Sequence, residues 1–114
     1  MSYREFPRMM IIRGLLQVII IYILCKHGDM YGYQLKRKVD ELHRRNVPQG
    51  LIYTTLKRMV KNGLLNSYLR EGRTYYTPTD GGRQFLRNHL NVLSNVLAII
   101  HELVYPPDQG DVYS

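Results

Sequence analysis

The chain has 114 residues and a net charge of +7, from 16 lysines and arginines and nine aspartates and glutamates. A chain of this length builds one domain around one hydrophobic core. With one cysteine it forms no internal disulfide or thiolate metal cluster, and it has no glycine-rich phosphate loop, no nucleophile elbow and no metal-binding spacing among its four histidines. We therefore expect no enzyme, no metal site and no cofactor, in a protein of the reducing cytoplasm.

The excess positive charge is concentrated in the middle of the chain. Residues 36 to 73 contain ten cations and three acids, whereas the remainder contains six of each. A basic region of this kind attracts polyanions, with nucleic acid as the first candidate and an anionic membrane surface as the second.

The first predicted element is a helix from Met9 to His27, which contains the apolar run from Gly14 to Cys25. This run has 12 residues, whereas about 20 are needed to span a bilayer, so we expect a buried helix and no membrane partner. Its β-branched residues would also suit a strand, but its length favours a helix. Because the run is apolar nearly all round, several neighbours must cover it, and we expect Cys25 to be a small core residue.

A second helix is expected from Met30 to about Arg44, with Asp29 as its capping residue. Glycine is unfavourable in a first helical turn, so Gly32 predicts a close helix crossing or the approach of a ligand. The residues expected to face the core are Tyr31, Leu35, Val39 and Leu42. The turn that follows ends at Pro48, which disfavours a helical conformation for the residue before it.

The segment from Gln49 to Gly63 predicts a helix with two contrasting faces. Its apolar face, which must contact a core, consists of Ile52, Leu56, Met59 and Val60. The opposite face has three cations, two hydroxyl side chains and no acid, and it consists of Gly50, Tyr53, Thr54, Lys57, Arg58 and Lys61. Considered alone, the segment would also fit a solvated amphipathic helix, but the local excess of charge favours a polyanion-binding face.

Residues 64 to 78 change to strand periodicity and predict a two-stranded ribbon around Glu71 and Gly72. Arg70 and Arg73 flank its tip, which is therefore cationic. Tyr75 and Tyr76 are neighbours in the second strand, so we expect one to face the core and the other to face solvent or DNA.

The last predicted helix begins with Thr79 as its N-cap and ends at about Val104. A coiled-coil seam runs along it through Leu86, Leu90, Leu93, Leu97, Ile100 and Val104. A second apolar row lies beside the seam and contains Phe85, Val92, Val96, Ile99 and Leu103. Two rows are wider than one intramolecular contact requires, so we expect the helix to pack on the first helix of its own domain and on a second subunit, with Leu15 and Ile19 in the dimer interface. A wide contact within one chain is the alternative.

This order of elements predicts a mainly α fold with a small two-stranded β-wing, a winged helix-turn-helix. Four segments carry a closer resemblance: R-G-L-L-Q-V-I-I-I-Y-I-L, Y-G-Y-Q-L, G-L-I-Y-T-T-L-K-R-M-V-K-N-G-L-L and E-G-R-T-Y-Y-T-P-T-D-G-G-R. Together, over about residues 11 to 87, they resemble the PadR family of transcriptional regulators. The resemblance implies a dimeric repressor of the compact type, whose final helix packs with the first helix of the partner subunit.

The order of elements along the chain gives the expected domain plan. Residues 1–78 form the winged helix-turn-helix, 79–104 the dimerisation helix of the same compact unit, and 105–114 a disordered tail. The chain departs from the family at Leu51, where a small hydroxyl residue is usual, and at Pro48-Gln49, where Ser-Pro is common, so the bases read and the helix cap do not carry over. It has no tryptophan, so the binding of flat aromatic drugs between tryptophans at the dimer centre, which some relatives show, does not carry over either.

The function expected from these patterns is sequence-specific binding of double-stranded DNA by a homodimeric repressor. The third helix would enter the major groove, with Gln49 and Lys57 pairing to bases beside Tyr53 and Thr54. Phosphates or the minor groove would be contacted by Lys36, Arg37, Arg58, Lys61, Arg70 and Arg73.

Two other functions stay open at the level of sequence. The first is a winged-helix module that binds protein and no nucleic acid, because a fold does not fix a function. The second, compatible with DNA binding, is a sensor of an unidentified small-molecule effector in a dimer-centre cavity lined by Leu15, Ile19, Leu93 or Leu97.

Overall fold

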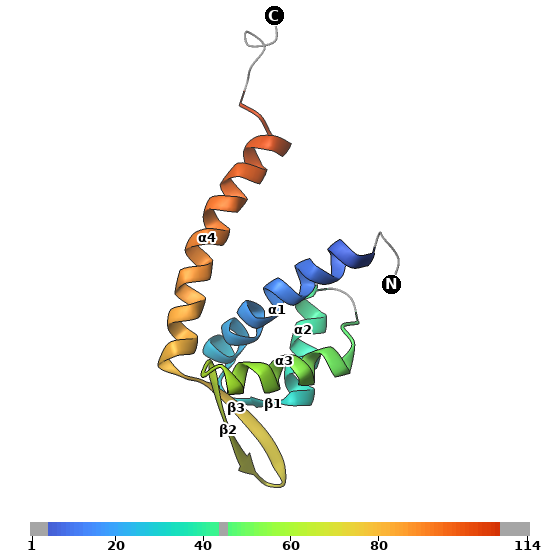
Figure 1. The fold of residues 1–114 in the computed structure, drawn as a ribbon, viewed down its shortest axis with the longest axis vertical. Coiled ribbons are helices and arrows are strands. Elements are labelled where there is room, and N and C mark those ends of the chain that lie inside the picture. The colour runs from blue at the N-terminus through green and yellow to red at the C-terminus, as the bar shows by residue number, and fades with distance from the viewer. Residues whose placement is uncertain (1–4, 44–45, 108–114) are drawn as a thin grey trace, which may run out of the picture.

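The computed structural model describes residues 5–43 and 46–107, with side chains of the first helix described from Leu15 onward. Figure 1 shows a small helical body from which one ribbon and one long helix project. The elements in chain order are α1 (Glu5–His27), β1 (Met30–Tyr31), α2 (Gly32–His43), α3 (Gln49–Lys61), β2 (Leu65–Arg70), β3 (Arg73–Pro78) and α4 (Asp80–Val104). The predicted fold class, mainly helical with a small β-wing, is confirmed.

Helix α1 forms the centre of the core. Leu16, Ile20 and Ile21 are almost completely buried, and α1 contacts α2, α3, α4 and β3, as expected for a helix that is apolar on several sides. The prediction that Cys25 belongs to the core is wrong, because Cys25 is exposed. It lies on the same outward strip of α1 as the 41 % exposed Tyr22, since residues three apart share a helix face.

The second helix begins two residues later than predicted. Met30 and Tyr31 form the short strand β1, which pairs antiparallel with Tyr76 and Tyr75 of β3, so the sheet has the order β1-β3-β2. Asp29 does not cap α2; its carboxylate accepts a hydrogen bond from the Tyr68 hydroxyl at 2.7 Å. The wing predicted as two strands therefore has a third, which fastens it to the start of α2.

Two residues predicted for the core face of α2 lie elsewhere. Leu35 and Val39 are buried as expected, but Leu42 is 56 % exposed and Tyr31 is in β1, partly buried. Leu42 is exposed because no element among the described residues covers the last turn of α2. Arg44, the predicted end of this helix, lies outside the described residues.

Helix α3 ends as its sequence predicts. Gly63 takes a left-handed conformation, with φ of +78°, and its N–H bonds to the Val60 carbonyl at 3.1 Å. The chain then enters β2, which pairs with β3 from Leu65 opposite Pro78 to Arg70 opposite Arg73. Glu71 and Gly72 form the two-residue turn, both with positive φ of 52° and 76°, which matches the twist of a hairpin.

Thr79 is the N-cap of α4, as predicted, and accepts a hydrogen bond from the Gly82 N–H at 2.9 Å. The same hydroxyl donates to the Gly63 carbonyl at 2.6 Å, so the start of α4 is fastened to the end of α3. Phe85 and Leu86 pack against the core, and beyond them α4 extends away from the body (Figure 1). Of the predicted tail, residues 108–114 lie outside the described residues.

Candidate nucleic-acid interface

Helix α3 presents its basic face to solvent because its apolar face is fixed in the core. Ile52, Leu56 and Met59 have no exposed surface. The sequence did not single out Thr55, which is also buried and donates its hydroxyl hydrogen bond to the Leu51 carbonyl at 2.6 Å. The predicted polar face is exposed along its length, at Gly50, Tyr53, Thr54, Lys57, Arg58 and Lys61.

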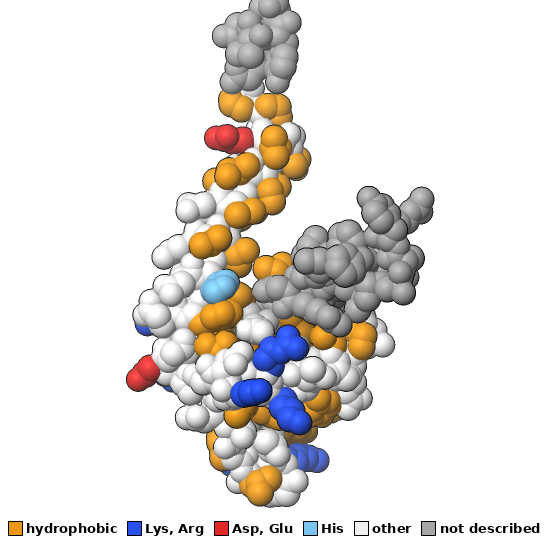
Figure 2. Space-filling view, in the orientation of Figure 1, with side chains coloured by type: hydrophobic (Ala, Val, Ile, Leu, Met, Phe, Trp, Pro, Cys, Tyr) orange, Lys and Arg blue, Asp and Glu red, His pale blue; other side chains and the backbone are white. Residues whose placement is uncertain are grey.

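Lysine and arginine side chains gather over α3 and beside the wing in Figure 2, whereas the acidic side chains on this face lie along α4. Among the residues that the structure describes, salt bridges join Lys36 to Asp40, Lys38 to Glu41 and Arg83 to Asp80. No cation of α3 or of the wing takes part in them. These charges are therefore available to an external anion.

The two basic residues predicted on α2 have different surroundings. The Lys36 ammonium lies 2.6 Å from an Asp40 carboxylate oxygen and 2.7 Å from the Asn46 amide oxygen, and its side chain is only 14 % exposed. Arg37 is exposed and borders a shallow hollow with Lys38 and Glu41. Lys36 thus holds the middle of α2 to the loop before α3, and a phosphate would have to compete with these partners.

The first turn of α3 lies beside a hollow of about 360 Å³. Pro48 occupies the N-cap position and makes no side-chain capping bond, so the departure from the family's helix start noted above leaves this end without a side-chain cap. Gln49 is exposed in this first turn. The hollow is lined by Gln17, Pro48, Gly50, Leu51, Thr54, Thr55 and Arg58.

The wing arginines rest on tyrosine rings. The Arg73 guanidinium carbon lies 4.5 Å from the centre of the Tyr31 ring, and that of Arg70 lies 5.8 Å from the Tyr75 ring. Tyr75 in turn stacks on Tyr68 at 5.8 Å and meets the edge of Tyr31 at 5.5 Å. These contacts favour defined positions for both guanidinium groups at the outer end of the sheet.

A hydrogen bond ties this aromatic stack to the loop before β1. The Tyr68 hydroxyl donates to Asp29, and this bond raises the pKa of Tyr68 above its ordinary value of 10.0, because only the protonated hydroxyl of Tyr68 can donate it. Of the tyrosine pair in β3, Tyr76 packs against the core and Tyr75 contacts the other rings. Tyr76 is therefore the member of the pair that faces the core, which the sequence left open.

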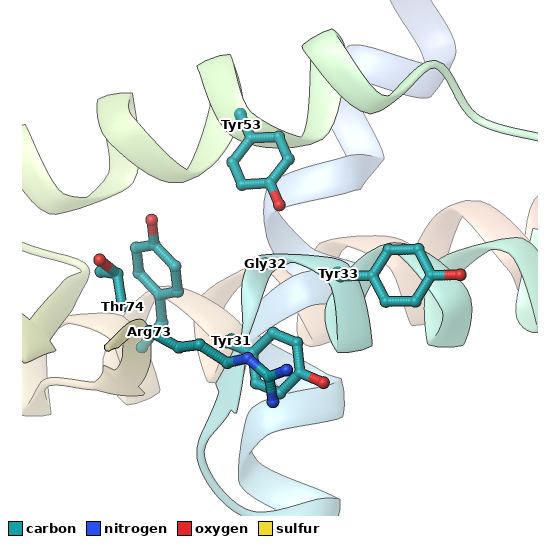
Figure 3. A pocket seen from close by; sticks show the side chains of 7 residues that line it. Tyr31, Gly32, Tyr33, Tyr53, Arg73 and Thr74 are labelled. Atoms are coloured by element: carbon teal, nitrogen blue, oxygen red, sulfur yellow. The ribbon is translucent and has the colours of Figure 1, made fainter. Parts of the chain in front are cut away.

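A cleft of about 690 Å³ lies between the start of α2, helix α3 and β3. Its lining consists of Tyr31, Gly32, Tyr33, Tyr53, Arg73, Thr74 and Tyr76 (Figure 3). Of these, Tyr53 and Arg73 were predicted site residues, and the unusual Gly32 was the sequence signal for a close approach. The signal was correct, because a Cβ at Gly32 would lie 2.8 Å from Cζ of Tyr53.

The residues predicted to form a dimer interface divide into two groups. Leu15 and Ile19 of α1, and Leu86 and Leu93 of α4, are partly buried within this chain. The other predicted members of the seam are between 47 % and 66 % exposed, namely Leu90, Leu97, Ile100 and Val104. Much of α4 therefore presents apolar surface that the described part of the chain leaves uncovered.

The described residues contain no helix with the length and hydropathy needed to cross a membrane. Within the same residues, no group of three or more histidine, cysteine or acidic side chains is arranged to hold a metal ion.

Comparison with known proteins agrees with this architecture. The transcriptional regulator PadR-like family matches residues 20–88, and no curated protein matches the chain. A PadR-like transcriptional regulator from Bacillus cereus is 28 % identical with a TM-score of 0.77, covering 86 % of this chain and 99 % of that one. A PadR family regulator from Clostridium difficile is 30 % identical with a TM-score of 0.70, covering 80 % and 99 %. Since the family match spans more than half of the sequence and includes α2, α3 and the wing, this chain belongs to the PadR-like family of transcriptional regulators.

Proposed function

We propose that this protein is a sequence-specific DNA-binding repressor that acts as a homodimer. The observation that carries the proposal is the surface on which Lys57, Arg58 and Lys61 of α3 lie exposed without ion-pair partners among the described residues. The wing adds Arg70 and Arg73, which are also exposed and unpaired there. A duplex carries a regular array of phosphates that such a surface would neutralise.

In the proposed complex α3 enters the major groove, which admits one helix. Gln49, Thr54 and Lys57 lie on its outward face and are the candidates to contact base edges, Gln49 with adenine and Lys57 with guanine. Arg58 and Lys61, nearer the end of α3, contact phosphate. The wing lies along the adjacent backbone or minor groove.

Two copies are proposed to associate through α4, with Leu15 and Ile19 of α1 in the same contact. The exposed apolar residues of α4 recur along 25 residues of helix, and a contiguous apolar surface of this kind marks an interaction site. A twofold dimer would place two α3 helices on one face of a duplex, so the operator should be a palindrome.

A small-molecule effector that releases DNA remains part of the proposal. Leu93 of α4 and Leu15 and Ile19 of α1 are partly buried, and Leu97 is 66 % exposed. These four residues would line the centre of the dimer, where an apolar ligand could bind between the subunits. Isothermal titration of the protein with candidate ligands, in the presence and absence of operator, measures how strongly ligand binding and DNA binding oppose each other.

Fluorescence anisotropy of a labelled duplex, titrated across salt concentrations, tests DNA binding. If about six phosphates are neutralised, affinity should fall by roughly a thousandfold between about 50 and 200 mM salt. Selection of bound fragments from random duplexes then identifies the operator. Affinity that does not change with salt would contradict the proposal and favour the alternative, a winged-helix module that binds protein.

A further inference from the structure

The cleft between α3 and the wing is lined by hydroxyl groups, one guanidinium and no carboxylate. Its hydroxyls come from four tyrosines and Thr74, and its cation is Arg73. Every polar side chain in it can therefore donate a hydrogen bond. Figure 3 shows the Tyr53 hydroxyl extending from α3 toward Gly32, with Arg73 on the other side of the opening beside Tyr31.

Arg73 is positioned by a ring and not by an acid. Its guanidinium carbon lies 4.5 Å from the centre of the Tyr31 ring, and none of the salt bridges among the described residues involves it. A cation held over an aromatic face keeps its N–H donors unused. Tyr31 itself is fixed by strand pairing with Tyr75 and by the edge contact between their rings.

Tyr53 reaches the cleft because Gly32 has no side chain. An added Cβ at Gly32 would lie 2.9 Å from the Tyr53 hydroxyl oxygen, so any larger residue would displace the ring. Burial, and then the nearby Tyr53, raise the pKa of Tyr76 above 10.0. Hydroxyl donors and one arginine thus surround the same opening from β1, α2, α3 and β3.

We propose that this cleft is a phosphate site, in which Arg73 and the Tyr53 hydroxyl donate to the oxygens of one phosphate group. The guanidinium fork matches phosphate geometry, and the opening lies between the two elements proposed to contact a duplex. The proposal rests on the proposed DNA binding and adds to it: Tyr53 contacts backbone and not a base. A phosphodiester of the duplex and free phosphate share this chemistry, so the experiment must separate them.

The first measurement is the slope of log affinity against log salt for any duplex, which needs no knowledge of the operator. Replacing Arg73 by Gln should reduce the steepness of this slope by about one, which is the value for one lost phosphate contact. Arg87→Gln is the matched control, because it removes the same charge from the exposed surface of α4, where Arg87 bonds only to Gln84 among the described residues. Equal slopes for the two variants would overturn the phosphate site.

The outcomes also separate this inference from the function on which it rests. A wild-type protein that binds no duplex refutes the proposed function. A wild-type protein that binds with a salt-dependent affinity, while Arg73→Gln and Arg87→Gln behave alike, refutes only the cleft.

A double-mutant cycle tests the role of the Tyr31 ring. Tyr31→Leu should weaken duplex binding in the wild-type background and have little further effect in the Arg73→Gln background, because the ring acts through the guanidinium. Additive losses would contradict this positioning role.

Tyr53→Phe removes one hydroxyl without changing the ring. If Tyr53 contacts phosphate, the variant should lose the same affinity on all duplex sequences. A loss confined to one base position would overturn that assignment.

The source of the phosphate is read from the Nε–H resonance of Arg73 in a proton–nitrogen spectrum. We expect a short duplex to shift this resonance to saturation, whereas millimolar inorganic phosphate, matched in ionic strength with chloride, shifts it only partly and is displaced by duplex. Saturation by inorganic phosphate that excludes the duplex would overturn the backbone assignment. An unchanged resonance with both probes would overturn the site itself.

Discussion

Gly81 and Gly82 are adjacent glycines in the first turn of α4, but the structure gives them different surroundings. A Cβ on Gly82 would lie 3.2 Å from the Leu64 carbonyl carbon and closer still to its oxygen. A Cβ on Gly81 would lie 3.3 Å from the Gly63 carbonyl oxygen and 3.5 Å from the Thr79 hydroxyl. The nearest obstruction is a backbone carbonyl at both positions, but at Gly82 it lies well inside van der Waals contact, whereas at Gly81 it is only slightly too close. Gly82→Ala should therefore destabilise the protein more than Gly81→Ala.

The magnitude follows from two opposed effects. Alanine in a helix is favoured over glycine by about 0.5–1 kcal/mol. Forcing an extra carbon into a packed site costs about 1–3 kcal/mol. The free energy of unfolding should therefore fall by about 1–2 kcal/mol for Gly82→Ala, because the start of α4 must move away from Leu64, and should change by less than about 1 kcal/mol for Gly81→Ala.

Urea denaturation of both variants and of the wild type, at one protein concentration, measures these differences. Equal concentration is needed because a dimer gains stability by mass action. In thermal denaturation, each kcal/mol should lower the midpoint by roughly 4–8 °C for a domain of about this size. A Gly82→Ala protein as stable as Gly81→Ala, with an unchanged m-value, would refute the close crossing of α4 over the backbone of Leu64.

Three further variants test the core, the wing and the proposed dimer. Leu56→Ala should lower the free energy of unfolding by about 2–5 kcal/mol, because Leu56 is completely buried; a smaller urea effect would contradict that burial. Tyr68→Phe removes the hydrogen bond to Asp29. Because the folded-state pKa of Tyr68 is raised above 10.0, the stability that this bond contributes is present below pH 10.0 and is lost as pH rises through the raised pKa. The thermal midpoints of Tyr68→Phe and the wild type should therefore converge in alkaline buffer, and a constant difference would contradict the pKa shift. Leu97→Glu introduces a charge at a 66 % exposed seam position and should convert the proposed dimer to a monomer in light scattering, whereas an unchanged mass would exclude α4 from the interface.

Some features of the candidate site could be predicted because they depend on a single segment. The two faces of α3 follow from helical spacing, so the burial of Ile52 and the exposure of Lys57 were both expected and are observed. The position of the wing turn follows from Gly72, since glycine adopts positive φ readily, whereas Glu71 takes a positive φ that its residue type disfavours. Local preference and tertiary contacts agree at Ile52, Lys57 and Gly72.

Other features depend on residues far apart in the sequence and could not be predicted. Tyr31 has an acceptable helical pattern, but pairing with Tyr75 across the sheet makes it a strand residue. Lys36 was predicted to contact phosphate; helical spacing places Asp40 one turn away on the same helix, but only the fold brings the Asn46 amide oxygen of the following loop to its ammonium. No periodicity in the sequence predicts the strand pairing of Tyr31 or the contact of Lys36 with Asn46, because those partners lie in another strand and in a loop whose position is set by folding.

By itself, the sequence of this protein determined the helices, the turns and the faces of α3, because backbone preference and hydrophobic periodicity act over a few neighbouring residues. Only the tertiary structure decided which surfaces stay uncovered, at Cys25, Leu42 and much of α4, since exposure depends on where other elements end. It also decided that Arg73 lies on the ring of Tyr31 and that Tyr53 lies over Gly32. These contacts join four elements, β1, α2, α3 and β3, and their energies exist only when those elements have packed together.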